Sequence, residues 1–141
     1  MANTLYPKTK TKILKALLDL SSVSLKVILV DLADYTYDPA HDFLNDVPAG
    51  ARVAISAAGL ANKVFSESGD LSVFDADDVT LVGVTGDTSE ALIIYNDTPG
   101  TEATKELVAI ITTFTAGVPV TPNSGDILIT WPNTTNKIFA W

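Results

Sequence analysis

Short runs of β-branched and other apolar residues, separated by turn-forming residues, dominate the sequence after residue 22. We place about eight strands at these runs: 23–31, 51–57, 71–74, 79–84, 90–96, 107–114, 126–131 and 136–141. The segments between them, such as SESGD (66–70), NDTPG and PNSGD, are rich in residues that favour tight turns. Strands this short and this regularly spaced predict an all-β fold: a β-sandwich or a jelly-roll-like single domain, with a partly closed barrel as a third form of the class.

The order of the runs suggests which strands pair. We expect the strands within 79–96 and those within 107–131 to form meanders, since strands adjacent in sequence are usually adjacent in a sheet. The segments GDILITW and NKIFAW are expected to form a terminal hairpin across PNTTN. In the first of them, Ile127, Ile129 and Trp131 share one face by the period of two residues.

One stretch near the N-terminus has a helical period instead. Pro7 suits a first helical position, and five apolar residues follow at spacings of one to four: Ile13, Leu14, Leu17, Leu18 and Leu20. Lysines occupy the other face, so the pattern predicts an amphipathic helix over 7–20. We therefore divide the chain into a basic N-terminal arm and helix (1–22) and a β-sandwich domain (23–141).

Length and composition are those of one cytoplasmically made domain. The chain has 141 residues, enough to bury about two-thirds of the surface of the unfolded chain. It has no cysteine, so no disulfide or thiolate metal site can form. The N-terminus lacks the apolar run of a signal peptide, and no window is long enough to span a membrane. We expect synthesis in the cytoplasm and no membrane association.

Charge is distributed unevenly. The net charge is −8, yet residues 1–26 carry five lysines against one acidic residue. A basic arm on an acidic body indicates docking to a partner or a neighbouring subunit through Lys8, Lys10, Lys12 and Lys15. The alternative is a solvated lysine face on a helix. Nucleic acid is not an expected partner, because the body would repel phosphate and Arg52 is the only arginine.

Candidate catalytic and metal-binding residues are few. His41 is the only histidine and stands between Asp38 and Asp42, where a surface histidine beside solvated acids is the favoured interpretation over a base or ligand.

Asp75, Asp77 and Asp78 are weak calcium candidates, favoured less than a simple acidic turn, because the glycine and distal glutamate of an EF-hand loop are missing. No nucleophile or phosphate-loop motif occurs, so we expect neither catalysis nor a cofactor.

Four aromatic residues are candidates for recognition: Tyr35, Tyr37, Trp131 and Trp141. Aromatic side chains can form a platform on which sugars stack, and they also serve as anchors in protein interfaces. We favour interface anchors and keep carbohydrate binding as the alternative.

Several linked stretches resemble a family of small virion structural proteins of tailed bacteriophages. The resemblance is carried by VSLKVILVDLADYTYDPAHDFLNDVPAGARVA, VFDADDVTLVGVTGD, EALIIYNDT and LVAIITTFTAGVPVTPNSGDILITWPNTTNKIFAW, in that order, and covers nearly all of residues 4–141. The chain departs from the family pattern at Ser124, where glycine is frequent, and at Phe114, where the stretch is usually more polar. The family offers no catalytic residue to carry over.

This resemblance implies a structural role in the virion. The expected function is that of a capsid decoration (cement) protein, which binds and stabilises the shell of the major capsid protein. The alternatives are a tail- or neck-associated component and a β-module that binds host glycans. We also expect a homo-oligomer, with a trimer favoured, because closed symmetry multiplies weak contacts. Residues 1–20 would then reach the shell or an adjacent copy, and their deletion is expected to leave the sandwich folded but to abolish particle binding.

Overall fold

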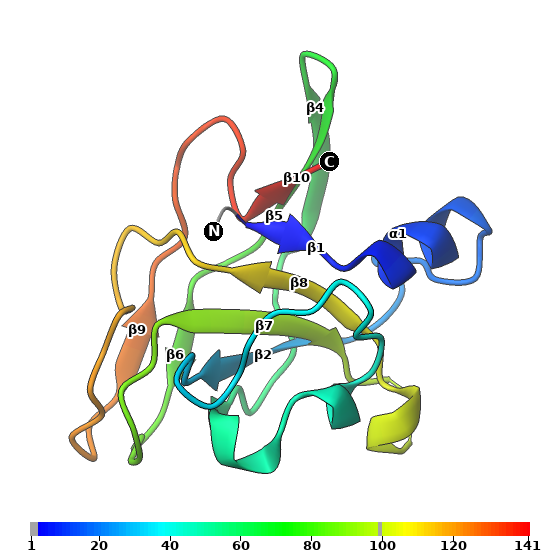
Figure 1. The fold of residues 1–141 in the computed structure, drawn as a ribbon. Helices are drawn as coiled ribbons and strands as arrows, with labels where there is room; N and C mark the ends of the chain where they lie inside the picture. Colours follow the sequence, from blue (N-terminus) through cyan, green and yellow to red (C-terminus); the bar gives the residue numbers. More distant parts are fainter. Residues whose placement is uncertain (1–2, 99) are drawn as a thin grey trace.

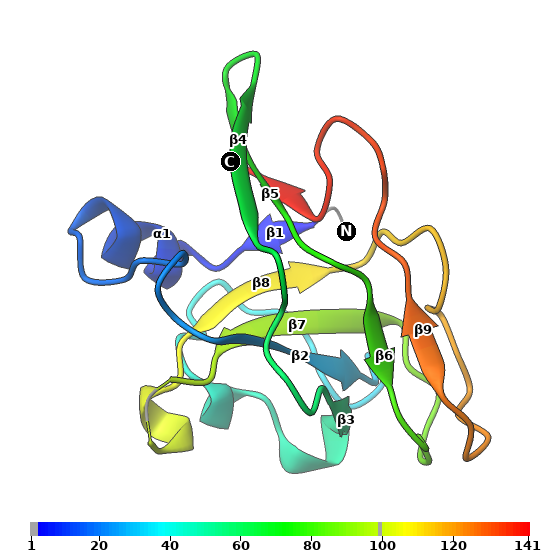
Figure 2. The ribbon, with the colours of Figure 1, turned by 180° about the vertical axis from the view of Figure 1, so that it is seen from behind.

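The computed structural model, which describes residues 3–98 and 100–141, is built from three antiparallel sheets (Figures 1 and 2). The largest has the strand order β1-β8-β7-β2-β3, with bounds Thr4–Leu5, Leu107–Ile111, Ala91–Asn96, Leu25–Val30 and Arg52–Ile55. The second has the order β10-β5-β4, with bounds Phe139–Ala140, Leu71–Asp75 and Val64–Ser68. The third pairs β6 (Val79–Leu81) with β9 (Ile127–Ile129). The predicted all-β class is thus confirmed.

Helical structure is limited in the described residues. One α-helix, α1, spans Pro7–Leu14. Three short 3-10 turns follow later in the chain, η1 at Leu44–Asp46, η2 at Ala49–Ala51 and η3 at Glu102–Thr104. The single short helix therefore agrees with the prediction of an all-β chain with one N-terminal helix.

The five-stranded sheet is apolar on both faces because both faces are covered. Alternate residues of β2 belong to different clusters, with Val27 and Leu29 on one side and Ile28 and Val30 on the other. The cluster on the first side, here called the large core, lies against β5, β6, β9 and β10. The cluster on the second side, the small core, lies under the loops and 3-10 turns of residues 31–51. The sheet therefore separates two cores.

The predicted terminal hairpin is wrong. Strand β9 pairs with β6 in the register Val79↔Ile129 to Leu81↔Ile127, and β10 pairs with β5 in the register Phe139↔Phe74. Each strand is held by a distant partner because that pairing places its apolar face in the large core. The apolar C-terminal residues do lie in a strand, but beside β5.

The predicted meanders are also wrong. Strand β6 does not pair with its sequence neighbour β7, and β8 does not pair with β9. Instead β7 lies between β2 and β8 and pairs with β2 over its whole length, from Leu25↔Asn96 to Val30↔Ala91. Strand β7 is buried and lies at the centre of the sheet, where one partner, β8, is the next strand in the sequence and the other, β2, comes from a distant segment.

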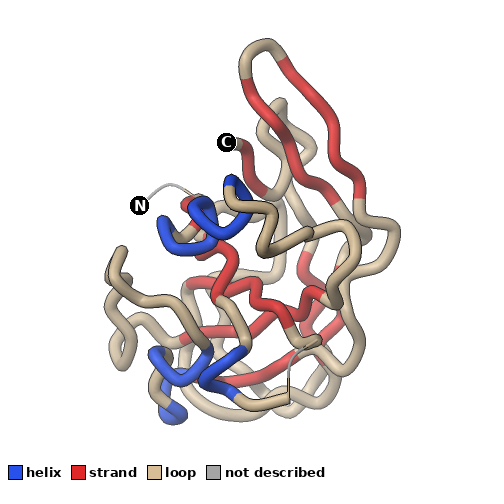
Figure 3. Tube along the Cα trace, turned by 90° about the vertical axis from the view of Figure 1, so that its right-hand side faces the viewer, coloured by secondary structure: helices blue, strands red, loops and turns tan. Residues whose placement is uncertain are grey.

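A hairpin that we did not predict projects from the body. Residues 66–70 were expected to form a turn, but β4 and β5 pair from Val64↔Asp75 to Ser68↔Leu71. The turn itself is Gly69 and Asp70, with Gly69 at a φ of +60° that favours glycine. Figures 1 and 3 show the turn end of this hairpin projecting beyond the rest of the chain, and β4 is the edge strand of the second sheet.

Helix α1 is shorter than predicted, and its end has a defined geometry. The backbone N–H of Ala16 donates to the Ile13 carbonyl at 3.0 Å, and that of Leu17 donates to the Lys12 carbonyl at 2.9 Å. These two hydrogen bonds form a Schellman motif, in which Ala16 takes a left-handed φ of +56°. The chain turns here so that Leu18 and Leu20 reach the large core.

The predicted basic arm does not stand apart from the body. Thr4 and Leu5 form β1 at the edge of the five-stranded sheet, paired with Ile110 and Ala109. Tyr6 is fully buried, and the Thr9 hydroxyl donates to the Leu107 carbonyl at 2.5 Å. The described residues of 1–22 thus belong to the same folded unit as residues 23–141, and deletion of residues 1–20 is now expected to unfold part of the sheet.

Candidate assembly interface

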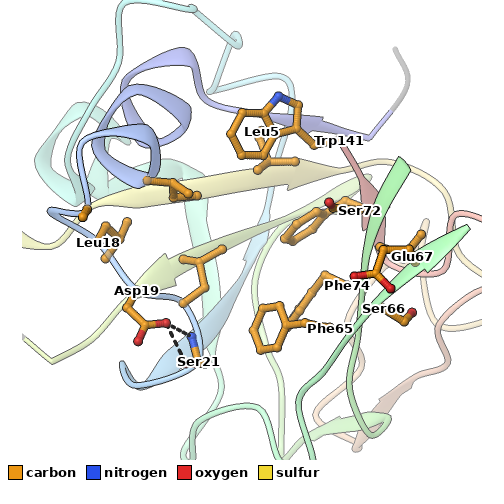
Figure 4. A pocket seen from close by; sticks show the side chains of 15 residues that line it. Leu5, Leu18, Asp19, Ser21, Phe65, Ser66, Glu67, Ser72, Phe74 and Trp141 are labelled. Carbon is orange, nitrogen blue, oxygen red and sulfur yellow. Dashed lines mark hydrogen bonds between the residues drawn. The ribbon is translucent and has the colours of Figure 1, made fainter. Parts of the chain in front are cut away.

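An apolar groove of about 600 Å³ separates the end of α1 from the projecting hairpin (Figure 4). Leu18, Asp19 and Ser21 line one wall, and Phe65 and Glu67 of β4 line the other. The wall after α1 is tied to the base of the hairpin by Lys63, whose ammonium donates to the Leu20, Ser21 and Val23 carbonyls at 2.8, 3.1 and 2.5 Å. These bonds fix the distance between the two walls.

A row of three aromatic rings crosses the second sheet and reaches the groove. Phe139 stacks on Phe74 with ring centroids 4.8 Å apart, and Phe74 contacts Phe65 at 5.2 Å. Phe139 and Phe74 are buried, whereas Phe65, on the edge strand, is 47% exposed. The row therefore begins in the large core and ends as an uncovered apolar surface.

More apolar surface lies around the groove. Leu14 and Leu17 are 77% and 71% exposed, and Trp141 is 39% exposed. The backbone of Trp141 is fixed by two hydrogen bonds of 2.9 Å with Ser72, so its indole ring is held at the groove (Figure 4). Clustered exposed apolar residues of this kind mark interaction sites on folded proteins.

Charged side chains flank this apolar surface. Asp19 and Glu67 are exposed on opposite walls, and hydrogen bonds from the Ser21 side chain and backbone hold the pKa of Asp19 below its ordinary value. Lys8 and Lys15 are exposed on α1 and just after it, and the Lys10 ammonium lies 5.8 Å from the centre of the Trp141 ring. In the described part of the chain, none of these three lysines forms an ion pair.

Lys12, the fourth lysine predicted to bind a partner, is engaged within the molecule. Its ammonium lies 2.6 Å from a carboxylate oxygen of Asp42 and 4.2 Å from the centre of the Phe43 ring. It anchors α1 on the loop that covers the small core. The prediction of a docking role is therefore wrong for Lys12, while Lys8, Lys10 and Lys15 are placed where a partner could reach them.

The favoured prediction of interface anchors is wrong for Tyr35 and Trp131, and the alternative, a sugar-binding platform, does not form either. Tyr35 is 3% exposed in the small core, and Trp131 is 5% exposed in the large core, where its indole N–H donates to the Asp77 carbonyl at 2.9 Å. Tyr37 is half-buried and contacts the ring of Tyr6. Because the five-stranded sheet lies between Trp131 and the two tyrosines, the residues cannot form one sugar-binding surface. Of the four aromatic candidates, Trp141 alone lines the groove.

His41 is part of a hydrogen-bonded chain with two tyrosines. Its Nδ1 lies 2.9 Å from the Tyr35 hydroxyl, which lies 2.8 Å from the Tyr6 hydroxyl. The neighbouring acids point elsewhere, since Asp38 accepts a hydrogen bond from the Ala40 backbone and Asp42 pairs with Lys12. His41 with its neighbouring acids therefore has the contacts of a structural residue.

The three aspartates considered for calcium do not converge. Asp75 lies 3.6 Å from Lys137, Asp77 accepts from the Asn62 amide at 2.6 Å, and Asp78 accepts from the Trp131 backbone at 3.0 Å. Each carboxylate has its own partner, so this acidic turn is not a calcium loop.

Another cluster of acidic residues was not predicted from the sequence. Carboxylate oxygens of Asp31, Asp34 and Asp87 lie within 4.8 Å of one another. One Asp31 oxygen already accepts a hydrogen bond from Ala33 at 2.7 Å, and the other two residues are exposed. Apart from the proximity of the three carboxylates, nothing in the described residues marks this cluster as a metal site.

Comparisons with known proteins leave the family open: no protein-family model matches the chain, and no curated protein matches it in sequence. Within the residues that the structure describes, no helix has the length and apolar character required to cross a bilayer.

The groove was missed at the sequence level. Leu14 and Leu17 were assigned to the apolar face of a longer helix, and Phe65 stood next to a predicted turn. The five apolar residues of 13–20 fit one face of a helix, so the local pattern held no signal of the groove. The structure buries Leu18 and leaves Leu14 and Leu17 at the surface, because the helix ends at the left-handed turn of Ala16.

Proposed function

We propose that the protein is a non-catalytic structural component of a tailed-bacteriophage virion, and that it acts as a decoration protein on the shell of the major capsid protein. Two observations support the proposal. The sequence resembles small virion proteins over nearly all of residues 4–141. The folded chain also presents an uncovered apolar surface, made by the groove with Leu14, Leu17, Phe65 and Trp141.

The main structural support for this proposal is the apolar groove. An apolar side chain exposed on the surface gains about 25 cal/mol for each square ångström that a partner covers. Four large apolar side chains around one groove therefore favour association, and their fixed backbone limits the entropy that association would cost. A protein made for assembly needs such a surface, whereas a catalytic site needs converging titratable groups, and the described His41, Asp38 and Asp42 do not converge.

Co-sedimentation with purified phage particles tests the proposal. The full chain is expected to sediment with particles that lack it and to dissociate as salt or temperature rises. Decorated shells are expected to withstand heating better than undecorated shells, because the ligand stabilises the state that it binds. A chain that never sediments with particles would refute the virion role.

Copy number separates the two virion positions. A shell protein is present in hundreds of copies per particle, whereas a tail or neck component is present in a few dozen at most. Quantitative mass spectrometry of purified particles, or imaging at side-chain resolution, gives this number directly. A count in the hundreds supports decoration, and a count of a dozen supports the tail or neck.

A further inference from the structure

We propose that the groove receives residues 14–17 of a second copy of this chain, so that the protein forms a closed homo-oligomer through the end of α1 and the β4–β5 hairpin. This inference deepens the proposed function by naming the surface and the occupant of one assembly contact. It requires nothing about the phage shell, so it can be tested on the purified chain.

The occupant is a preformed apolar ridge. Leu14 ends α1, and Leu17 follows the left-handed turn at Ala16, where the Schellman hydrogen bonds fix the backbone. In many such turns the residue at the position of Leu17 packs back on the helix, yet here it is 71% exposed. The turn therefore holds both leucines outward, and little conformational freedom is lost when a partner covers them.

The groove suits this ridge in size and chemistry. Its volume of about 600 Å³ lies within the range of about 300–1,000 Å³ over which pockets bury compact ligands. Phe65, Phe74 and Leu18 give it apolar walls and floor, and Trp141 stands at its end (Figure 4). Two leucine side chains can enter it without burying an unpaired polar group of their own.

Charge complementarity favours a second copy of this chain over a partner that offers apolar residues alone. Lys15 lies between the two leucines in sequence, is exposed and has no ion pair among the described residues. Glu67 is exposed on the hairpin wall and likewise has no ion pair there. When the ridge of one copy enters the groove of another, Lys15 lies between walls that carry Glu67 and Asp19. The ridge is basic and the groove is acidic, within one sequence.

The ridge and the groove are placed so that two copies can each insert a ridge into the groove of the other. Ile13 and Ala16 line the groove, while Leu14 and Leu17 of the same turn are exposed beside it. Ridge and groove are therefore adjacent on one face, as a two-fold interface requires, where each copy gives and receives the same residues. The smallest closed assembly is then a dimer, in place of the trimer expected from the sequence.

Sedimentation velocity of the full chain across a concentration series, with and without substitutions in the ridge, tests the contact. The unmodified chain is expected to be oligomeric at micromolar concentration. The double variant Leu14→Ser, Leu17→Ser should raise the dissociation constant at least tenfold. Both leucines are exposed, so the fold is expected to persist, and circular dichroism checks this. Val82→Ser is the matched control, because Val82 is 76% exposed and does not line the groove; its dissociation constant should change less than twofold.

A charge exchange tests the partner of Lys15. Lys15→Glu and Glu67→Lys should each raise the dissociation constant severalfold, and the two together should restore it, because the exchanged pair attracts again. Single variants with no effect, or a double variant that is weaker than both, would overturn the assignment of Glu67. A chain that is monomeric at every concentration, or an oligomer insensitive to the leucine changes, would overturn the inference itself.

These outcomes separate the inference from the proposed function. A monomeric chain that still sediments with phage particles contradicts the self-contact and leaves the virion role standing. An oligomer that depends on Leu14 and Leu17 but never sediments with particles supports the self-contact and contradicts the virion role.

Discussion

The hydroxyl oxygens of Tyr6 and Tyr35 lie 2.8 Å apart in the small core, and the second of them also contacts His41. This pair joins residues 29 positions apart and ties the N-terminal segment to the loop after β2. Burial disfavours the charged phenolate, so the pKa of Tyr6 rises far above its ordinary value and that of Tyr35 rises to about 12.

The first prediction concerns alkaline pH. When a tyrosine has a higher pKa in the folded state than in the unfolded state, the protein loses stability as pH rises from the unfolded-state pKa to the folded-state pKa. We expect the free energy of unfolding to begin to fall near pH 10 and, as pH approaches 12, to decrease by up to about 3 kcal/mol for each of the two tyrosines. Denaturant titrations at stepped pH measure this, and Tyr6→Phe should show a smaller fall. A free energy that does not change between pH 10 and 12 would contradict the prediction.

The second prediction concerns the turn after α1. Ala16 has a φ of +56°, which costs a residue with a β-carbon about 1–2 kcal/mol, and glycine avoids that cost. Part of the gain is lost to the greater freedom of glycine in the unfolded chain, so Ala16→Gly should stabilise the protein by about 0.5–1 kcal/mol. Thermal and denaturant unfolding give the change. Ala58→Gly, at an exposed alanine outside the left-handed region, is the control and should not stabilise.

The third prediction concerns the wall of the groove. Lys63→Met removes the ammonium that donates to three carbonyls of residues 20–23 and should destabilise the protein by about 2 kcal/mol. Hydrogen exchange of amides in 18–23 should quicken more than that of β7. Lys8→Met, at an exposed lysine, should change stability by less than about 0.5 kcal/mol. Equal effects of the two substitutions would show that Lys63 does not support the wall.

The fourth prediction concerns the two tryptophans. Trp131 is 5% exposed and Trp141 is 39% exposed, so a water-soluble quencher should reach the second alone. Acrylamide titration of the intact chain should show two populations of fluorescence, and Trp141→Phe should leave the protected one. Protection of Trp141 that increases with protein concentration is expected where the groove is occupied. Strong quenching in Trp141→Phe would place Trp131 at the surface.

The sequence predicted strands better than it predicted their partners. The alternation of Ile127 and Ile129 identifies a strand and its buried face, but it is equally satisfied by a hairpin partner at 136–141 and by the actual partner at 79–81. Packing of the whole large core decides between the two partners of β9, and a local sequence pattern carries no information about that packing. For the same reason β7 was located at the right residues and assigned to the wrong sheet neighbours.

Local exceptions account for the other errors. The helix was extended to residue 20 because alanine rarely ends a helix in the left-handed conformation, and Ala16 does so here. Strand β4 was overlooked because the last three of its five residues are polar, as suits a strand that projects into solvent. Of the candidate interface residues, Trp141 lines the groove, Lys10 lies beside its ring and Lys15 precedes the lining residue Ala16. Tyr35 and Trp131 were selected for their chemistry and are buried.

The five-stranded sheet acts as a partition, with a separate apolar compartment on each side. Substitutions in the two compartments share no side-chain neighbours, so their energetic effects should add. A protein engineer could therefore reshape the groove side, to accept a new cargo or to abolish self-contact, while the tyrosine compartment continues to hold the scaffold together.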